Sequence, residues 1–101
     1  MRVMLIIRLA NEAFNTAVRD GSAGPKMKRI LDKLKPEATY FTEMNGQRTG
    51  VIVVDLEGPS KIPALAEPWF LTFDAAVEIH VIMGPEELEK AGLDILGKEW
   101  S

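Results

Sequence analysis

Two stretches of the chain have apolar patterns typical of strands: one alternates apolar and polar residues, and the other is a short continuous apolar run. Residues 75–83 (AAVEIHVIM) place Glu78 and His80 on one face and a row of apolar residues on the other. That row is Val77, Ile79, Val81 and Met83. Residues 2–10 form a short branched-aliphatic run bounded by turn formers. We expect both stretches to be strands of one sheet.

The segment ATYFTEMNGQRTGVIVVDL predicts a β-hairpin, because Asn45-Gly46 between two β-prone runs is the preferred type I′ turn. A two-residue turn fixes the register of the two strands. The expected cross-strand pairs are all favourable ones. They are Glu43 with Arg48, Thr42 with Thr49, Phe41 with Gly50, and Tyr40 with Val51.

Apolar residues recur at helical spacing in the remaining segments. Asn11 can cap a helix that is broken at DGSAGP (residues 20–25), and a second helix follows and stops at Pro36. The next helix has a long apolar stripe and a kink or restart at Pro68. Its stripe is Ile62, Leu65, Ala66, Trp69, Phe70 and Phe73. Pro85 begins a short final helix.

The resulting order of strand, broken helix, hairpin, helix and strand is the βαββαβ unit. We therefore predict one α+β domain over residues 1–101, of the ferredoxin-like fold. In this fold the helices cover only one face of a four-stranded antiparallel sheet.

Alternation also predicts which strand residues lie on the uncovered face. These are Met4, Ile6, Arg8, Tyr40, Thr42, Met44, Val51, Val53, Asp55, Glu78, His80 and Ile82. Such an apolar surface indicates an interface or a ligand groove, and we expect a two-fold homodimer through this face. The alternative is a monomer in which the C-terminal segment with Leu93, Leu96 and Trp100 folds over the patch.

Composition narrows the class of protein. The net charge of −3 argues against a nucleic-acid surface, and a basic stretch between Lys26 and Lys35 is best interpreted as a solvated helix face. There is no cysteine, which excludes disulfides and thiolate chemistry. The N-terminal run MRVMLIIRLA has no signal-peptide pattern and is too short for a membrane span. We expect a cytoplasmic protein that contacts neither nucleic acid nor membrane.

Two segments carry a resemblance to a known family: KPEATYFTEMNGQRTGVIVVDL and IPALAEPWFLTFDAAVEIHVIMGPEELEKAG. They resemble small bacterial proteins of the dimeric α+β barrel group, and the similarity runs through most of the chain. The wider group includes muconolactone isomerases, cofactor-independent monooxygenases, dye-decolourising haem enzymes and stress-response proteins. No catalytic motif of these groups occurs in the sequence. The resemblance therefore implies the fold and the dimeric barrel and carries over no functional residue.

The uncovered face holds the candidate chemistry. Glu78 and His80 project from one strand to the same side and can shuttle a proton, while Arg8 on the neighbouring strand can hold an anion. Tyr40 can donate a hydrogen bond to a substrate over the same face. The competing interpretation, which we favour, is a structural ion-pair cluster in a dimer seam. One histidine and one carboxylate are too few ligands for a catalytic zinc site, so we expect no metal and no cofactor.

Three functions follow from these observations. The leading hypothesis is a dimer that binds a small molecule between its sheets or serves as a scaffold. The alternative is a cofactor-independent enzyme, like an isomerase or monooxygenase, acting on a small, partly apolar anion. In it His80 is the acid or base, Glu78 orients it and Arg8 clamps the anion. The third is a purely structural interaction module.

Overall fold

The computed structural model describes residues 1–101 and is built from one antiparallel sheet and a set of helices. The chain order confirms the predicted α+β arrangement. Its elements are β1 (Arg2–Arg8), α1 (Asn11–Asp20), α2 (Ala23–Leu34), β2 (Ala38–Met44), β3 (Gln47–Asp55), the 3₁₀ turn η1 (Pro59–Lys61), α3 (Ile62–Phe73), β4 (Ala76–Val81), α4 (Pro85–Lys90) and α5 (Leu93–Glu99).

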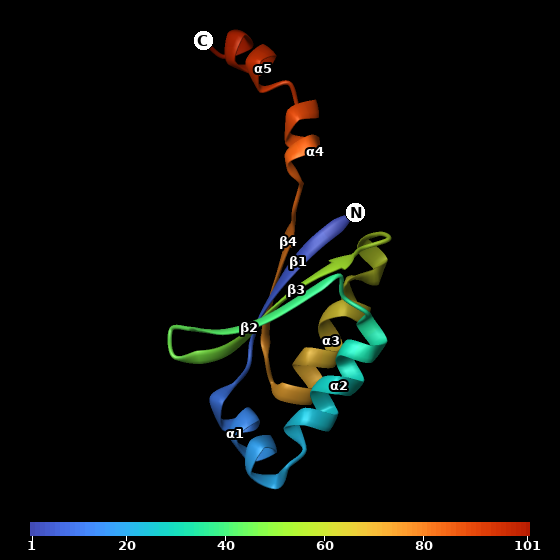
Figure 1. Ribbon diagram of the computed structural model, residues 1–101, viewed down its shortest axis with the longest axis vertical. Coiled ribbons are helices and arrows are strands. Elements are labelled where there is room, and N and C mark those ends of the chain that lie inside the picture. Colours follow the sequence, from blue (N-terminus) through green and yellow to red (C-terminus); the bar gives the residue numbers. More distant parts are fainter.

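The four strands lie in the order β2-β3-β1-β4, and every neighbouring pair is antiparallel. This α+β arrangement is compatible with a ferredoxin-like fold. Figure 1 shows α2 and α3 together on one side of the sheet and α1 at its lower end. The opposite face, which we call the open sheet face, is covered by no other element of the chain.

The β2–β3 hairpin has the register expected from its turn. Asn45 and Gly46 both have positive φ, 53° and 79°, as a type I′ turn requires. All four predicted cross-strand pairs are confirmed. Glu43 and Arg48 face each other but form no ion pair, and the Glu43 carboxylate accepts the Gly46 N–H at 3.0 Å.

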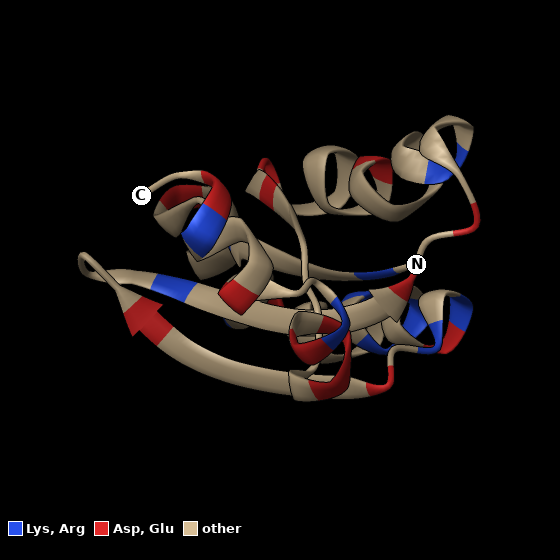
Figure 2. Ribbon diagram, turned by 90° about the horizontal axis from the view of Figure 1, so that it is seen from above, with Lys and Arg blue, Asp and Glu red and all other residues tan.

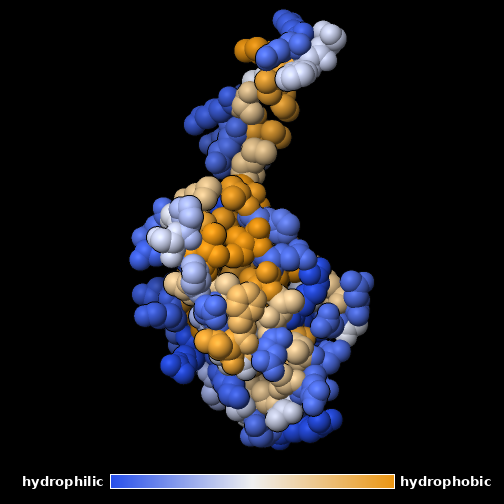
Figure 3. Space-filling model, turned by 180° about the vertical axis from the view of Figure 1, so that it is seen from behind, coloured by the Kyte–Doolittle hydropathy of each residue, from blue (hydrophilic) through white to orange (hydrophobic).

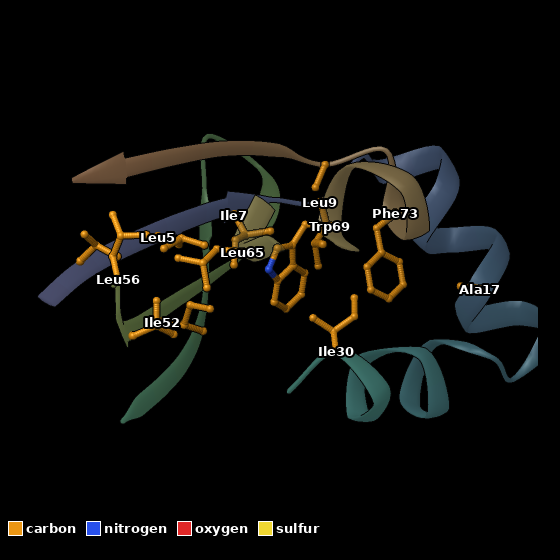
Figure 4. Packing of buried hydrophobic residues seen from close by; sticks show 13 residues of the cluster. Leu5, Ile7, Leu9, Ala17, Ile30, Ile52, Leu56, Leu65, Trp69 and Phe73 are labelled. Carbon is orange, nitrogen blue, oxygen red and sulfur yellow. The ribbon is translucent and has the colours of Figure 1, made fainter. Parts of the chain in front are cut away.

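The core lies between the sheet and the three long helices (Figure 4). The inward side chains of β1 and β3 are fully buried, and Trp69 and Phe73 of α3 pack against them. The buried apolar cluster consists of Val3, Leu5, Ile7, Leu9, Ala17, Ile30, Ile52, Val54, Leu56, Leu65, Trp69, Phe73 and Ala75. The Phe14 and Phe73 ring centroids are 5.2 Å apart, which joins α1 to the same core.

The ends of α1 and α2 differ from those predicted from local sequence signals. Asn11 is the first residue of α1 and not its cap, since Ala10 holds that position without a side-chain hydrogen bond. Only Gly21 breaks the helix within DGSAGP, and α2 begins two residues later. Pro25 is tolerated because it lies in the first turn, where its missing N–H costs no helical hydrogen bond.

The apolar stripe of α3 is narrower than its sequence pattern predicts. Ile62 and Phe70 lie at its margins and are exposed. The buried side chains are Leu65, Ala66, Trp69 and Phe73. Pro68 lies inside α3, which continues through it as one helix.

The C-terminal helices α4 and α5 extend away from the body along the direction of β4 (Figure 1). We call residues 85–101 the C-terminal arm. Leu93 is 58% exposed, Leu96 40% and Trp100 81%. The alternative in which this segment folds back over the chain's own open sheet face is therefore wrong. None of the helices has both the length and the apolar character needed to span a membrane.

Candidate functional site

The open sheet face brings together three of the four residues singled out from the sequence. Arg8 comes from β1, and Glu78 and His80 come from β4, which pairs with β1 at the edge of the sheet. Glu78 lies opposite Ile6, so Arg8 is its diagonal neighbour, two residues further along β1. Diagonal neighbours on one face of a sheet lie within reach of long side chains.

Glu78 bridges the other two side chains of the cluster. Its Oε1 accepts a hydrogen bond from Arg8 Nη1, and its Oε2 lies 3.1 Å from His80 Nε2. The Arg8 side chain is 26% exposed, Glu78 45% and His80 50%. The cluster is therefore preassembled and open to solvent in the single chain.

The two hydrogen bonds set the protonation of the cluster. The donor groups of Arg8 and, to a lesser extent, His80 lower the pKa of the Glu78 carboxyl below its ordinary value. An ionised carboxylate only accepts hydrogen bonds, so His80 Nε2 carries a hydrogen. The ring Nδ1 has no hydrogen-bond partner in the chain. With neutral His80 the Arg8–Glu78 pair has no net charge, and protonation of His80 makes the cluster positive.

Tyr40 lies on the same face but at the opposite edge of the sheet. The register joins Tyr40 to Val51, Val51 to Ile6, and Ile6 to Glu78 in one row across all four strands. Three strand spacings separate Tyr40 from Glu78, a distance of about 14 Å. A small molecule bound at Arg8 therefore cannot touch Tyr40 of the same chain, whose side chain is exposed.

The rest of the open sheet face is apolar and incompletely buried. Side chains from all of its central positions keep intermediate exposure. They are Met4, Ile6, Val51, Val53 and Ile82. The polar cluster thus borders a continuous apolar surface, an arrangement typical of an interface or of a ligand site.

Nowhere does the chain gather three or more His, Asp or Glu side chains in a group that could hold a metal ion. Glu78 and His80 supply two such ligands, and their partner Arg8 is a cation. A positive guanidinium on the same carboxylate disfavours a metal cation there. The donor set fits an anion better than a metal.

A small apolar cleft, missed from the sequence, lies on the helix side near the hairpin. It has a volume of about 350 Å³, at the lower end of the range for ligand pockets. The guanidinium of Arg48 lies 5.1 Å from the Phe14 ring centroid and donates to Asn15 Oδ1 at 2.8 Å. The predicted strand register pairs Arg48 with Glu43. No local sequence signal shows that Asn15 and Phe14 of α1 would bind the Arg48 side chain instead.

A second hollow lies between α2 and α3. It is a shallow groove of about 1340 Å³, with Lys26, Lys28, Arg29 and Lys33 on its α2 wall. Lys28 Nζ is paired with Asp32 at 2.6 Å, one turn further along α2. All these basic residues are exposed, which agrees with the solvated helix face expected from the sequence.

Comparison with known proteins adds no functional residue. The chain matches no protein-family model. A search of curated proteins also gives no significant match.

Proposed function

We propose that this protein is a homodimer, joined through the open sheet face, that binds a small, partly apolar anion between its two sheets. The observation that carries the proposal is the Arg8–Glu78–His80 cluster at the border of an apolar sheet surface that nothing in the chain covers. A homodimer of this kind is the ferredoxin-like, dimeric α+β barrel that the resemblance implies.

Burial of the apolar surface supports the dimer. Each partly exposed aliphatic side chain on the face gains free energy when a second sheet removes it from water. Two sheets pack about 10 Å apart, so side chains from both fill most of the space between them. A polar cluster at the border keeps access to solvent and can receive a ligand.

The ligand class follows from the charges. Arg8 offers planar N–H donors that suit a carboxylate or phosphate, and His80 adds a donor when protonated. The neighbouring Ile6 and Met4, which lie opposite Glu78 and His80, offer apolar contact. A small anion with an apolar body satisfies both parts of the surface.

Tyr40 joins this site only in one geometry of the dimer. A two-fold axis that runs parallel to the strands reverses the strand order between the sheets, so β2 of one copy lies over β4 of the other. Because Tyr40 and Glu78 share one row, Tyr40 of the second copy then faces Glu78. Replacing Tyr40 by Phe is expected to weaken ligand binding in that geometry and to leave it unchanged in any other.

A panel of small aliphatic and aromatic carboxylates and phosphates, read by thermal shift, tests the proposal. We expect at least one of them to stabilise the wild type, and Arg8→Ala and His80→Ala to lose that stabilisation. Arg2→Ala is the matched control, because Arg2 lies on the same face of β1 and is also paired with a glutamate, Glu37. Sedimentation over a dilution series tests the dimer. A monomer throughout, or stabilisation that survives in both site variants, would contradict the proposal.

One observation favours a catalytic version of the same site. Glu78 holds His80 through Nε2 and leaves Nδ1 open, which is the arrangement of a histidine oriented by a carboxylate for proton transfer. An isomerisation that begins by removing a proton from a carbon atom of the bound anion would need such a base. Exchange of substrate protons with deuterated water, lost in His80→Ala, distinguishes catalysis from binding.

A further inference from the structure

The C-terminal arm forms two helices, but its apolar side chains have no packing partner in the chain. Pro85 begins α4, and the Gly84 N–H donates to Glu87 Oε1 at 3.0 Å to cap it. Gly92 takes a left-handed conformation, φ 68°, that sets the bend between α4 and α5. Its large apolar side chains are nonetheless all exposed. They are Leu88, Leu93, Ile95, Leu96 and Trp100.

Such an arm is not stable on its own in water. The two helices have six and seven residues, whereas isolated helices shorter than about 12–15 residues are marginal even with favourable sequences. The chain is extended because this arm projects from the body. Its radius of gyration is 16.9 Å, against about 13 Å for a compact domain of this length, and it measures 59 Å along its longest axis.

We infer that the C-terminal arm is an exchange arm, which packs its apolar side chains against the body of a second copy of this chain. The inference rests on the homodimer proposed above and adds a second contact to it. In a two-fold pair each copy both gives and receives an arm, so the contact forms twice.

The position of the arm favours a second copy as its partner. It leaves the sheet directly after Ile82, a residue of the open sheet face, and points away from α2 and α3 (Figure 1). Figure 3 shows apolar residues gathered on the body next to the base of the arm and continuing along the arm. A subunit seated on the open sheet face therefore meets the arm as part of the same apolar surface.

The arm could contact either the body or the arm of the second copy, and the distribution of charge favours the body. The arm has five acidic residues and two lysines, so it carries the whole net charge of −3, and residues 1–84 are neutral overall. Figure 2 shows acidic and basic residues mixed over the remainder of the chain. Two arms would repel each other, whereas an arm on the neutral body meets no such repulsion. Each arm therefore lies on the partner's body.

Tryptophan fluorescence tests the inference in the full-length protein. Trp69 is buried in the core at 1% exposure, whereas Trp100 is 81% exposed in the single chain. We expect acrylamide to quench Trp100 several-fold less in concentrated samples than at dilutions where the dimer dissociates. The difference between wild type and Trp100→Phe isolates this signal. Hydrogen exchange of residues 85–101 should show the same dependence on concentration.

Substitution of one exposed leucine in the arm and one on the body separates the arm contact from general surface effects. Leu96→Asp is expected to raise the dissociation constant of the dimer by about tenfold or more, as loss of a central apolar side chain does. Leu71→Asp on α3 is the matched control, since Leu71 is 80% exposed and lies outside the arm. Trp69 emission reports whether each variant keeps its core.

The outcomes separate the arm from the sheet interface. A stable dimer in which Trp100 stays fully quenchable and Leu96→Asp has no effect would overturn the exchange arm and leave the dimer intact. If Leu96→Asp dissociates the dimer and Val53→Asp does not, the arm holds the pair and the sheet-face interface is wrong. A wild type that is monomeric at every concentration overturns both.

Discussion

The guanidinium of Arg8 on β1 and the carboxylate of Glu78 on β4 form an ion pair diagonally across two neighbouring strands, and His80 binds the second oxygen of the same carboxylate. The pair sits on the sheet face that has no helix. Glu78 therefore neutralises the charge of Arg8 and orients His80. Any anion that binds here must compete with Glu78 for the arginine.

The first prediction concerns acid stability. Hydrogen bonds from Arg8 and His80 lower the pKa of Glu78 from its ordinary value of 4.5. The ionised form therefore contributes stability that is present above about pH 4.5 and lost as the pH falls through the lower, folded-state pKa. We expect Glu78→Gln to be less stable than wild type near neutral pH and equal to it in acid. Chemical denaturation at a series of pH values measures this difference.

The control for that experiment is Glu57→Gln, since Glu57 is exposed and has no side-chain hydrogen bond or ion pair. It measures what the loss of an exposed carboxylate without such donors does to stability over the same range of pH. The Glu78 effect should also shrink at high salt, because the cluster is exposed. An equal pH dependence in both variants would contradict the role given to Arg8 and His80.

The second prediction separates binding from catalysis at the cluster. Glu78→Gln removes the charge that neutralises Arg8, so we expect carboxylate ligands to bind several-fold more tightly. If His80 acts as a base oriented by Glu78, proton exchange into the ligand should fall in the same variant. Calorimetric titration and deuterium incorporation measure the two effects. Weaker binding in Glu78→Gln would show that the carboxylate itself contacts the ligand.

Strand pattern and turn chemistry predicted most of the sheet. The Asn45-Gly46 turn fixed the hairpin register because only a few residues favour two consecutive positive φ values. Alternation of side chains along β1 and β4 then placed Arg8, Glu78 and His80 on one face. These features depend on local conformation, which a single sequence records well.

Features that depend on competition between distant groups were predicted poorly. Tyr40 shares a face with Glu78, but strand order places the two at opposite edges of the sheet. Arg48 leaves its cross-strand partner for Asn15 and Phe14 of α1. The sequence left open the alternative in which the arm covers its own chain, because the apolar spacing of the arm shows a need for burial without showing the direction of the helices.

The third prediction concerns the core beneath the sheet. Trp69 is 1% exposed, and its indole N–H is buried without an acceptor. Trp69→Phe removes that unpaired donor together with some apolar contact, so the two effects on unfolding free energy oppose each other. We expect it to cost clearly less than Phe73→Ala, which should lose about 3–5 kcal/mol. Urea denaturation followed by circular dichroism compares them, and equal losses would mean that the indole N–H finds a partner.

The fourth prediction tests the hairpin turn. Gly46 has φ 79° and open space around the position of a Cβ atom, so Gly46→Ala introduces backbone strain without a clash. The left-handed conformation should cost about 1 kcal/mol of unfolding free energy. Gly58→Ala is the matched control, because Gly58 is equally unobstructed but has an extended φ of −177°. It should change stability by less than about 0.5 kcal/mol. A Gly46→Ala variant as stable as Gly58→Ala would contradict the strain assigned to the left-handed conformation at this turn position.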